Sequence, residues 1–336
     1  MTKLGVGVVG VGMMGKRHAE NVCRLVPGAR LVAVADADRE RARRVAAELE
    51  VENAYDSVEA LVERNDIAAV VIASPAKHHA HAIQAAAAAR KHILCEKPLT
   101  TSLEEADAAL AAVTRAGVCF QIGHMRRYDP AYAAAKKRIE AGEIGAPFIF
   151  KAIGRDPEPP PPSYFEAGLE ATIFLDSSIH EFDLARWLMG DEVAEVHAFA
   201  AGLGAAEYAG LDPVDAGVVN LRFSRGGIGN VESFRHAGYG YDIRTEIVGS
   251  RGTIQVGYLR QTQQVVLSAA GAAYDVVDHW LVRFADAYLA EMRDFVETLR
   301  TGREPRVTGA DGRQALAISL AAQRSCREAR PIAVAP

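Results

Sequence analysis

The first third of the chain alternates short apolar runs with longer amphipathic stretches. Residues 4–9, 30–35, 67–73 and 118–123 are apolar almost throughout, which is typical of parallel strands buried on both faces. A similar run over 92–95 leads into Glu96-Lys97-Pro98. Helical patterns, among them 16–25, 78–90 and 103–116, lie between these runs. The alternation predicts a doubly wound parallel sheet.

The pattern changes after residue 123. Extended segments are predicted at 147–153, 194–201, 216–223, 228–234, 241–248 and 253–256. Within them apolar positions such as Val219 and Leu221 alternate with polar positions such as Asn220 and Arg222, so one face of a sheet packs inward. Glycine-rich turns join several of the segments. The second half is therefore predicted to be an α+β domain with a large, open, mainly antiparallel sheet.

Two domains follow from this change and from a length of 336 residues. Residues 1–123 are predicted to form a dinucleotide-binding Rossmann domain. Residues 124–336 are predicted to form an α+β domain for substrate binding and oligomerisation.

Glycines follow the first strand in the order Gly10-Val11-Gly12-Met13-Met14-Gly15, and a helical stretch follows them. This is G-x-G-x-x-G between a strand and a helix, the context in which the motif binds dinucleotides. Gly10 would make the tight turn, Gly12 would let the backbone approach the pyrophosphate, and Gly15 would let the helix pack against the strand. The helix N-terminus offers unpaired N–H groups to the phosphates.

Asp36 ends the second apolar run, about 20 residues beyond the glycine motif. A carboxylate at this place accepts the ribose hydroxyls of NAD and repels the additional phosphate of NADP. NAD is therefore the expected cofactor, although the nearby Arg39 leaves NADP as the alternative. Asp36 could also cap the helix that starts near Arg39.

Lys97 lies at the end of a predicted strand, where the two halves of the chain are expected to meet. Pro98 restricts Lys97 to an extended backbone, and a bond before proline can also be cis. We interpret Lys97 as the residue that contacts the substrate hydroxyl that undergoes oxidation. The alternative is a surface lysine beside a loop proline.

Asp176 and His180 are four residues apart in a stretch predicted to be helical. Residues with this spacing share a helix face, so the carboxylate can orient the imidazole and support its positive charge. Such a histidine can take a proton near neutral pH. The alternative is an Asp–His pair that only stabilises the helix.

Composition excludes several classes of protein. The formal net charge is −5 and no basic run is present, so neither nucleic acid nor an anionic membrane is expected as a partner. No apolar stretch is long enough for a membrane span. Four widely spaced cysteines favour reduced thiols in the cytoplasm. His78, His79 and His81 would not share one helix face, and no metal site is expected.

These motifs together resemble the glucose-fructose oxidoreductase/inositol dehydrogenase (Gfo/Idh/MocA) family. The resemblance rests on the glycine motif with Asp36, on Glu96-Lys97-Pro98, on the Met125–Asp129 segment and on Asp176-x-x-x-His180. It extends from about residue 4 to about residue 325. Within the family the inositol 2-dehydrogenases are the most similar, through the segment 174–187 and through Tyr239-Gly240-Tyr241-Asp242.

The resemblance implies a role for each matching position. Lys97 would contact the reacting hydroxyl, His180 would accept its proton, and Asp176 would bind substrate and position the pair. The implied cofactor residues are Gly10, Gly12, Met13, Met14, Gly15, Asp36, Ser74, Pro75, His79, Glu96 and Lys97. The implied substrate residues are Lys97, Arg127, Asp156, Asp176, His180 and Tyr239.

The chain departs from the family pattern at several positions. Ala76 replaces an asparagine, and Ser177-Ser178 replace a pair commonly written Met-Thr. Gly154 and Asp156 stand near where inositol dehydrogenases often have histidine and asparagine. Since hydrogen bonds select a hydroxyl-rich substrate, these positions bear on which polyol is used. The proline-rich segment 156–162 is predicted to be a stiff wall of the pocket or a plain spacer.

The resulting hypothesis is NAD-dependent oxidation of a ring hydroxyl of myo-inositol, or of scyllo- or chiro-inositol, to a ketone. A sugar dehydrogenase that oxidises an aldose with NAD or NADP is the alternative within the family. A catalytically silent dinucleotide or sugar sensor is the alternative outside enzymes. A homo-oligomer is expected, a tetramer or a dimer.

Overall fold

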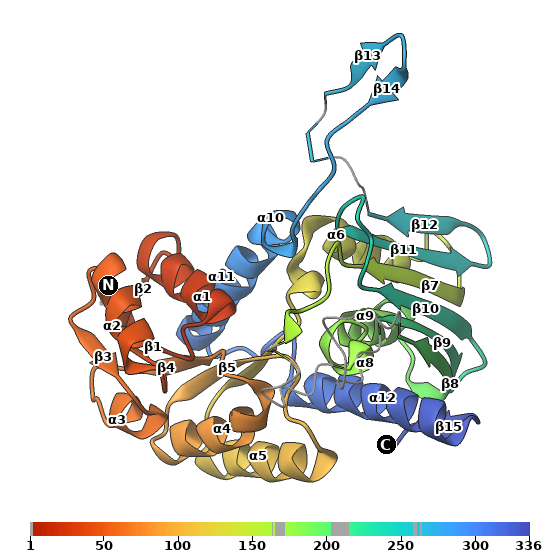
Figure 1. The fold of residues 1–336 in the computed structure, drawn as a ribbon. Helices are drawn as coiled ribbons and strands as arrows, with labels where there is room; N and C mark the ends of the chain where they lie inside the picture. The colour runs from red at the N-terminus through yellow and green to blue at the C-terminus, as the bar shows by residue number, and fades with distance from the viewer. Residues whose placement is uncertain (1–2, 163, 165–171, 203–214, 258–260, 263) are drawn as a thin grey trace. The chain divides into compact units, whose positions relative to one another are not determined.

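The computed structural model describes residues 3–162, 164, 172–202, 215–257, 261–262 and 264–336 (Figure 1). The chain forms two compact units. The first unit holds Met1–Tyr128 and Asp286–Leu316, and the second holds Asp129–Ala285 and Ala317–Pro336. The chain first passes from one unit to the other close to the predicted domain boundary. Residues 286–316, which were expected in the second domain, pack within the first unit.

The first unit is built on a six-stranded sheet in the order β3-β2-β1-β4-β5-β6, and all neighbouring strands are parallel. The strand order changes direction between β1 and β4, where open α/β sheets bind ligands at the carboxyl ends of the strands. The strands are β1 (Leu4–Val9), β2 (Ala29–Ala35), β3 (Asn53–Tyr55), β4 (Ala69–Ile72), β5 (His92–Glu96) and β6 (Phe120–Gly123).

Helix α5 (Leu103–Ala116) of the first unit has a capping residue at each end. Helix α5 starts after Ser102, whose hydroxyl accepts a hydrogen bond from the Glu105 N–H, and ends at Gly117 in the left-handed conformation. The other helices of this unit are α1 (Met13–Arg24), α2 (Arg39–Glu48), α3 (Val58–Val62), η1 (Ala76–His78), α4 (His79–Ala88), η2 (Met125–Tyr128) and α11 (Ala285–Thr301). Helix α12 (Gly309–Glu328) begins in the first unit and ends in the second.

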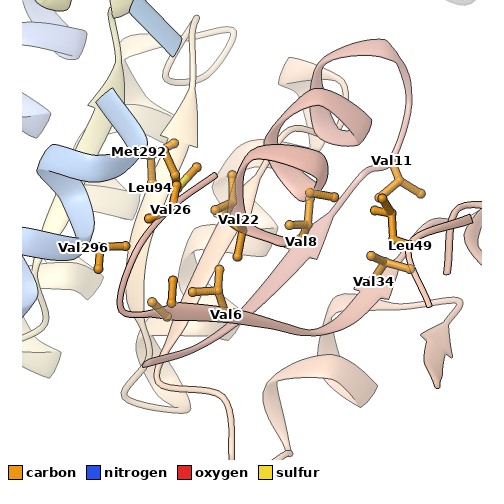
Figure 2. Close-up of a cluster of buried hydrophobic side chains, with 14 of the residues drawn as sticks. Val6, Val8, Val11, Val22, Val26, Val34, Leu49, Leu94, Met292 and Val296 are labelled. Atoms are coloured by element: carbon orange, nitrogen blue, oxygen red, sulfur yellow. The ribbon is translucent and has the colours of Figure 1, made fainter. Parts of the chain in front are cut away.

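A core of the first unit brings together the first strands and helices of the chain and the late helix α11 (Figure 2). Val6 and Val8 on β1 pack with Val22 on α1. Met292 and Val296 on α11 complete the same cluster, with Phe295 beside them. Burying an apolar side chain of this size contributes roughly 1.5–3 kcal/mol. Helix α11, although late in the sequence, is therefore an integral part of the first unit's core.

The second unit contains a seven-stranded sheet in the order β12-β11-β7-β10-β9-β8-β15. Only β7 and β10 are parallel neighbours, so the sheet is mostly antiparallel. Burial alternates along β9, which confirms the predicted inward face. The strands are β7 (Pro147–Arg155), β8 (Val193–Ala201), β9 (Ala216–Phe223), β10 (Ile228–Phe234), β11 (Asp242–Gly249), β12 (Thr253–Val256) and β15 (Ile332–Ala333).

Helices pack against the inward face of this sheet. Helix α9 (Ile179–Met189) contacts β7 and β10, α8 (Ile173–Asp176) contacts β9, and α6 (Pro130–Glu140) contacts β12. A short helix α10 (Trp280–Arg283) follows a separate hairpin of β13 (Val266–Ser268) and β14 (Gly271–Ala273). The sequence analysis did not predict this hairpin.

The predicted fold class is confirmed in both units. The first has the parallel sheet with helices, and the second has the open, mainly antiparallel sheet. None of the helices in the described ranges combines the length and the apolar character that a bilayer crossing demands.

Candidate functional site

The turn between β1 and α1 excludes side chains at two of its glycines and is open at the third. Gly10 has a φ of +79°, and a Cβ there would lie 2.4 Å from the backbone N of Ser74. A Cβ on Gly15 would lie 1.7 Å from the Gly10 carbonyl oxygen, so both positions require glycine. A Cβ on Gly12 would meet no atom within 4 Å. The approach to the helix N-terminus at Gly12 is therefore open, and Met13 beside it is exposed.

Asp36 lies directly after β2 with its carboxylate facing the same turn. It accepts hydrogen bonds from the backbone N–H groups of Val11 and Asp38, both at 2.9 Å. Arg41 approaches it at 3.3 Å. Two backbone donors fix the carboxylate at the point where the ribose of a dinucleotide is expected. The cap of α2 is Asp38, which accepts from the Arg41 N–H, so the alternative role of Asp36 as the helix cap is wrong.

Arg39, whose position near Asp36 in the sequence kept NADP as the alternative cofactor, pairs with a different carboxylate. Its guanidinium lies 3.9 Å from the carboxylate of Asp56. Arg41 is the arginine next to Asp36. The glycine turn and the fixed carboxylate together fit a dinucleotide with an unmodified ribose.

His79 links the loops that follow β4 and β5. Its Nε2 lies 2.7 Å from the Ser74 carbonyl oxygen and its Nδ1 lies 2.8 Å from the Pro98 carbonyl oxygen. Burial lowers the pKa of His79, and these two carbonyls oppose the shift without reversing it. A neutral imidazole donates a hydrogen bond from only one of these nitrogens. We expect His79 to act on the cofactor through its place between the loops that carry Pro75 and Lys97.

Lys97 follows β5 and is half-buried. The Lys97–Pro98 peptide bond is cis. The backbone N–H of Lys97 donates to Glu96 Oε2 at 3.2 Å, and Glu96 Oε1 lies 2.7 Å from His18 Nε2. Burial raises the pKa of Glu96, but the His18 hydrogen bond and the Lys97 charge outweigh it, so the pKa of Glu96 is lowered. Lys97 thus sits beside a fixed, ionised carboxylate.

Arg127 lies in η2 and is buried against α12 within the first unit. Its guanidinium donates to Asp311 Oδ1 at 2.9 Å. Burial alone would raise the pKa of Asp311, but Arg127 and two Thr308 hydrogen bonds outweigh it and lower the pKa to about 2. Any part that Arg127 takes in binding a polyol would be shared with this ion pair.

Asp176 and His180 belong to two helical segments. Helix α8 ends at Asp176, α9 starts at Ile179, and the Ser178 N–H bonds to the Ile173 carbonyl five residues back. The single continuous helix expected across this stretch is therefore wrong. Ser177 and Ser178 stay near helical dihedral angles but widen the turn between the segments. His180 is buried in the first turn of α9.

Arg235 is the partner of Asp176 that the sequence analysis missed. It follows β10, is almost wholly buried, and donates to Asp176 Oδ2 at 2.9 Å. A buried guanidinium that pairs with a carboxylate fixes both its charge and its direction. In the sequence, the only hint of this pair is a charged residue directly after an apolar strand pattern. That hint does not identify the partner, because 59 residues separate Arg235 from Asp176.

Asp156 and Tyr239 lie in separate hydrogen-bond groups of the second unit. Ser177 donates to Asp156 Oδ2 at 3.4 Å, which places Asp156 beside the α8–α9 turn. The Tyr239 hydroxyl donates to Asp242 at 2.8 Å and accepts from Arg155 at 3.0 Å. Asp156 is thus brought to the segment of Asp176 and His180, whereas the Tyr239 hydroxyl is engaged by side chains at the ends of β7 and β11.

His79 and His81, two of the three neighbouring histidines, have separate surroundings in the first turn of α4. His81 is exposed and lies 2.7 Å from Glu59, while His79 holds the two loops. Among the described residues, the only group with metal-ligand spacing is His18, Glu96 and Glu291. All three residues are buried, and Glu96 directly precedes Lys97 in the chain.

Comparison with known families assigns both parts of the chain. Residues 4–124 match the sequence profile described as "Oxidoreductase family, NAD-binding Rossmann fold", and residues 136–334 match its "C-terminal alpha/beta domain". The chain belongs to the Gfo/Idh/MocA oxidoreductase family. The family resemblance read from the motifs is thereby confirmed.

Two members of the Gfo/Idh/MocA family with full-length similarity are named as inositol dehydrogenases. The scyllo-inositol 2-dehydrogenase (NAD(+)) of Bacillus subtilis is 40% identical over 97% of this chain and 94% of its own. The myo-inositol 2-dehydrogenase of Thermotoga maritima is 37% identical over 97% of each chain. Among solved structures, scyllo-inositol dehydrogenase from Lactobacillus casei with bound NAD(H) and scyllo-inositol has a TM-score of 0.92, 26% identity and complete coverage of both chains.

Proposed function

We propose that this protein oxidises a ring hydroxyl of an inositol to a ketone with NAD as the hydride acceptor. Full-length similarity to scyllo- and myo-inositol 2-dehydrogenases supports the activity. The observation that carries the cofactor choice is the open glycine turn beside Asp36, whose carboxylate is fixed by two backbone N–H groups. Such a carboxylate suits two ribose hydroxyls and disfavours an additional phosphate.

The proposed chemistry divides between Lys97 and His180. Bound NAD supplies the acceptor for the hydride that leaves the substrate carbon. His180 removes the hydroxyl proton, and Lys97 stabilises the developing alkoxide by donating a hydrogen bond. Asp176 binds the substrate beside His180, and its ion pair with Arg235 keeps the carboxylate in place. General-base assistance of this kind contributes roughly 10²–10⁴-fold to the rate.

Arg127, Asp156 and Tyr239 are the further residues proposed to contact the polyol. Their hydrogen-bond partners include Asp311, Ser177 and Asp242, so each side chain has a defined direction before substrate binds. Ordered donors and acceptors discriminate between inositol isomers, because a mismatched hydroxyl leaves a buried group without its partner.

Steady-state rates with NAD against myo-, scyllo- and chiro-inositol, beside glucose and other aldoses, test the proposal. We expect an inositol to give the highest kcat/KM, and nuclear magnetic resonance of the product to identify an inosose. A preference for an aldose, with a lactone as the product, would contradict the assignment to inositol. Tight NAD binding with no turnover of any polyol would favour a sensor instead.

An aldose dehydrogenase remains the second candidate because of one local feature. A Cβ on Gly154 would lie 2.8 Å from Glu181 Oε1, and Glu181 is buried. The histidine often found near this position in inositol dehydrogenases would need a different arrangement of Glu181. The loss of that hydrogen-bonding side chain could suit a different pattern of hydroxyls.

We propose a homo-oligomer, a dimer or a tetramer, in the cytoplasm. The outward face of the second unit's sheet mixes apolar and charged side chains, among them Ile228, Val218 and Lys151. The β13–β14 hairpin exposes Val266 and Leu267, although a two-stranded hairpin is marginal in water by itself. Both features suit burial between copies of the chain, which sedimentation equilibrium tests. The four thiols support a reducing compartment.

A further inference from the structure

Three buried ionisable side chains, one of them on the residue before Lys97, lie close together and have no part in the chemistry proposed above. His18 comes from α1, Glu96 from the end of β5 and Glu291 from α11. All three are buried, and one ligand atom of each lies within 4.8 Å of the others. They lie on segments separated by most of the chain, and α11 brings Glu291 to the pair of His18 and Glu96.

Burial in this cluster should change the protonation state of Glu291. Glu291 is wholly buried, and neither of its carboxyl oxygens has a hydrogen-bond partner among the described residues. An ionised carboxylate in such a place would be strongly disfavoured without a paired cation. Burial raises the pKa of Glu291 well above its usual value, and the nearby Glu96 and Asp294 carboxylates add to the shift.

Among the described residues, the charges that act most strongly on Glu291 are negative. Glu96 and Asp294 oppose its ionisation, and the buried phenol of Tyr128 lies close enough to be affected by both Glu291 and Asp294. His18 is the basic group of the cluster, but its Nε2 is already committed to Glu96 at 2.7 Å. The ring of Tyr288 stands edge-on to the His18 ring at 5.9 Å between centroids.

Glu96 connects the cluster to Lys97. One Glu96 oxygen is held by His18, and the other accepts the backbone N–H of Lys97. The Lys97 charge also contributes to keeping Glu96 ionised. Any change in the position or charge of Glu96 is therefore transmitted to the residue proposed to stabilise the alkoxide.

We propose that Glu291 remains a neutral carboxylic acid at neutral pH beside the His18–Glu96 pair, and that the cluster positions Lys97 for hydride transfer. Glu291 is then a positioning residue for the oxidation. The part concerning Lys97 rests on the proposed function. The part concerning the proton does not. A metal ion is a poorer occupant, because the 2.7 Å contact between His18 and Glu96 is a hydrogen bond and closer than two ligands of one ion normally lie.

Infrared difference spectroscopy tests the proton directly on the full chain. We expect the carbonyl stretch of a buried, neutral carboxylic acid in the wild type at neutral pH, and we expect Glu291→Gln to lack it. The band should move on deuterium exchange as a carboxylic acid does. A spectrum with no such difference would mean that Glu291 is ionised, which overturns the proposal whether or not the protein oxidises an inositol.

Kinetics with NAD and the best inositol test the positioning role. Glu291→Gln keeps the shape and a hydrogen-bond donor, so it should retain most of the wild-type kcat. Glu291→Leu removes both polar atoms, and we expect kcat to fall about tenfold to 100-fold with the Kd for NAD little changed. Glu297→Gln, an exposed change on the same helix, is the matched control.

Three results would overturn the positioning role. Equal losses in Glu291→Gln and Glu291→Leu would mean that the negative charge itself is needed. Full activity in Glu291→Leu would mean that Lys97 does not depend on the cluster. One divalent ion per chain, measured by metal analysis and lost in both variants, would assign the cluster to a cation. If the wild type oxidises no polyol, the proposed function fails, while the infrared result still decides whether Glu291 carries the proton.

Discussion

Lys97 and Asp176 each have a buried ionisable partner system, but the two systems balance charge in different ways. Behind Lys97, Glu96 is held by His18, and Glu291 adds a carboxyl group for which burial favours the neutral form. Behind Asp176, the buried guanidinium of Arg235 supplies a permanent positive charge. A proton can be lost as pH rises, whereas a guanidinium stays charged at all ordinary pH values. The two halves of the proposed chemistry should therefore respond differently to pH and to substitution.

Removing either proposed catalytic side chain should have the largest effect. We expect Lys97→Ala and His180→Ala each to lower kcat by roughly 10²–10⁴-fold, because alkoxide stabilisation and proton removal both act in the transition state. Circular dichroism and thermal melting should show an intact fold in both variants. Near-normal turnover in Lys97→Ala would remove Lys97 from the chemistry.

Breaking the second unit's charge pair should cost both stability and activity. Arg235→Leu leaves the Asp176 carboxylate without its guanidinium, and the loss of one partner from a buried pair costs about 3 kcal/mol. We expect a lower melting temperature together with a lower kcat. Arg324→Ala, which removes an exposed arginine near Glu328, should change stability by less than about 1 kcal/mol. Similar effects in the two variants would mean that Arg235 is not a special support of Asp176.

The Arg127–Asp311 pair of the first unit should make the free energy of unfolding depend on pH in the acid range. The pKa of Asp311 is lowered to about 2 from 3.8, so its stabilising contribution is present above pH 3.8 and is lost as pH falls toward 2. That contribution amounts to about 2 kcal/mol. Asp311→Asn should therefore destabilise the protein at neutral pH and much less in acid. Denaturant unfolding at both pH values measures the difference.

Glu291 should make stability change with pH in the opposite direction to Asp311, and over a higher pH range. Its pKa is raised above 4.5, so the unfolded chain releases this proton first and stability falls as pH rises from 4.5 toward the raised value. We expect Glu291→Gln to flatten that fall, with a stability relative to wild type that improves as pH increases. The same denaturant series checks it. A stability difference that does not change with pH would contradict a raised pKa.

Cofactor preference should show the smallest effect. Asp36→Ala removes the carboxylate that opposes the additional phosphate of NADP and leaves Arg41 at the same place. We expect the preference for NAD over NADP to fall by about tenfold. Asp38→Ala removes the α2 cap, so it should lower stability without altering the preference. Ratios of kcat/KM for the two cofactors decide the matter.

The first unit was more predictable from sequence than the second. Its strands are continuous apolar runs, its glycine turn has a fixed spacing, and α5 begins and ends at the predicted residues because Ser102 and Gly117 cap it. Local patterns such as these depend on neighbouring residues only. The element of this unit that was not predicted is α11, which contributes Met292 and Val296 to the core although it lies late in the sequence.

The second unit's strands were also predicted well, but its polar contacts were not. The alternation along β9 and β10 identified both strands with their observed bounds. The Arg235–Asp176 pair depends on a contact between β10 and α8 that no local period encodes. The widened turn at Ser177 and Ser178 was missed because the backbone there remains near helical angles. Burial of charged groups depends on tertiary packing, which spacing alone does not predict.

The place of α11 in the dinucleotide-binding core has a consequence for biosynthesis. The six strands emerge from the ribosome first, but Met292, Phe295 and Val296 cannot cover them until nearly the whole polypeptide has been made. The nascent nucleotide domain must therefore wait with an uncovered apolar surface while the entire second sheet is translated. Chaperone capture during that interval, and poor solubility of a fragment ending at residue 128, are the expected marks of such a split domain.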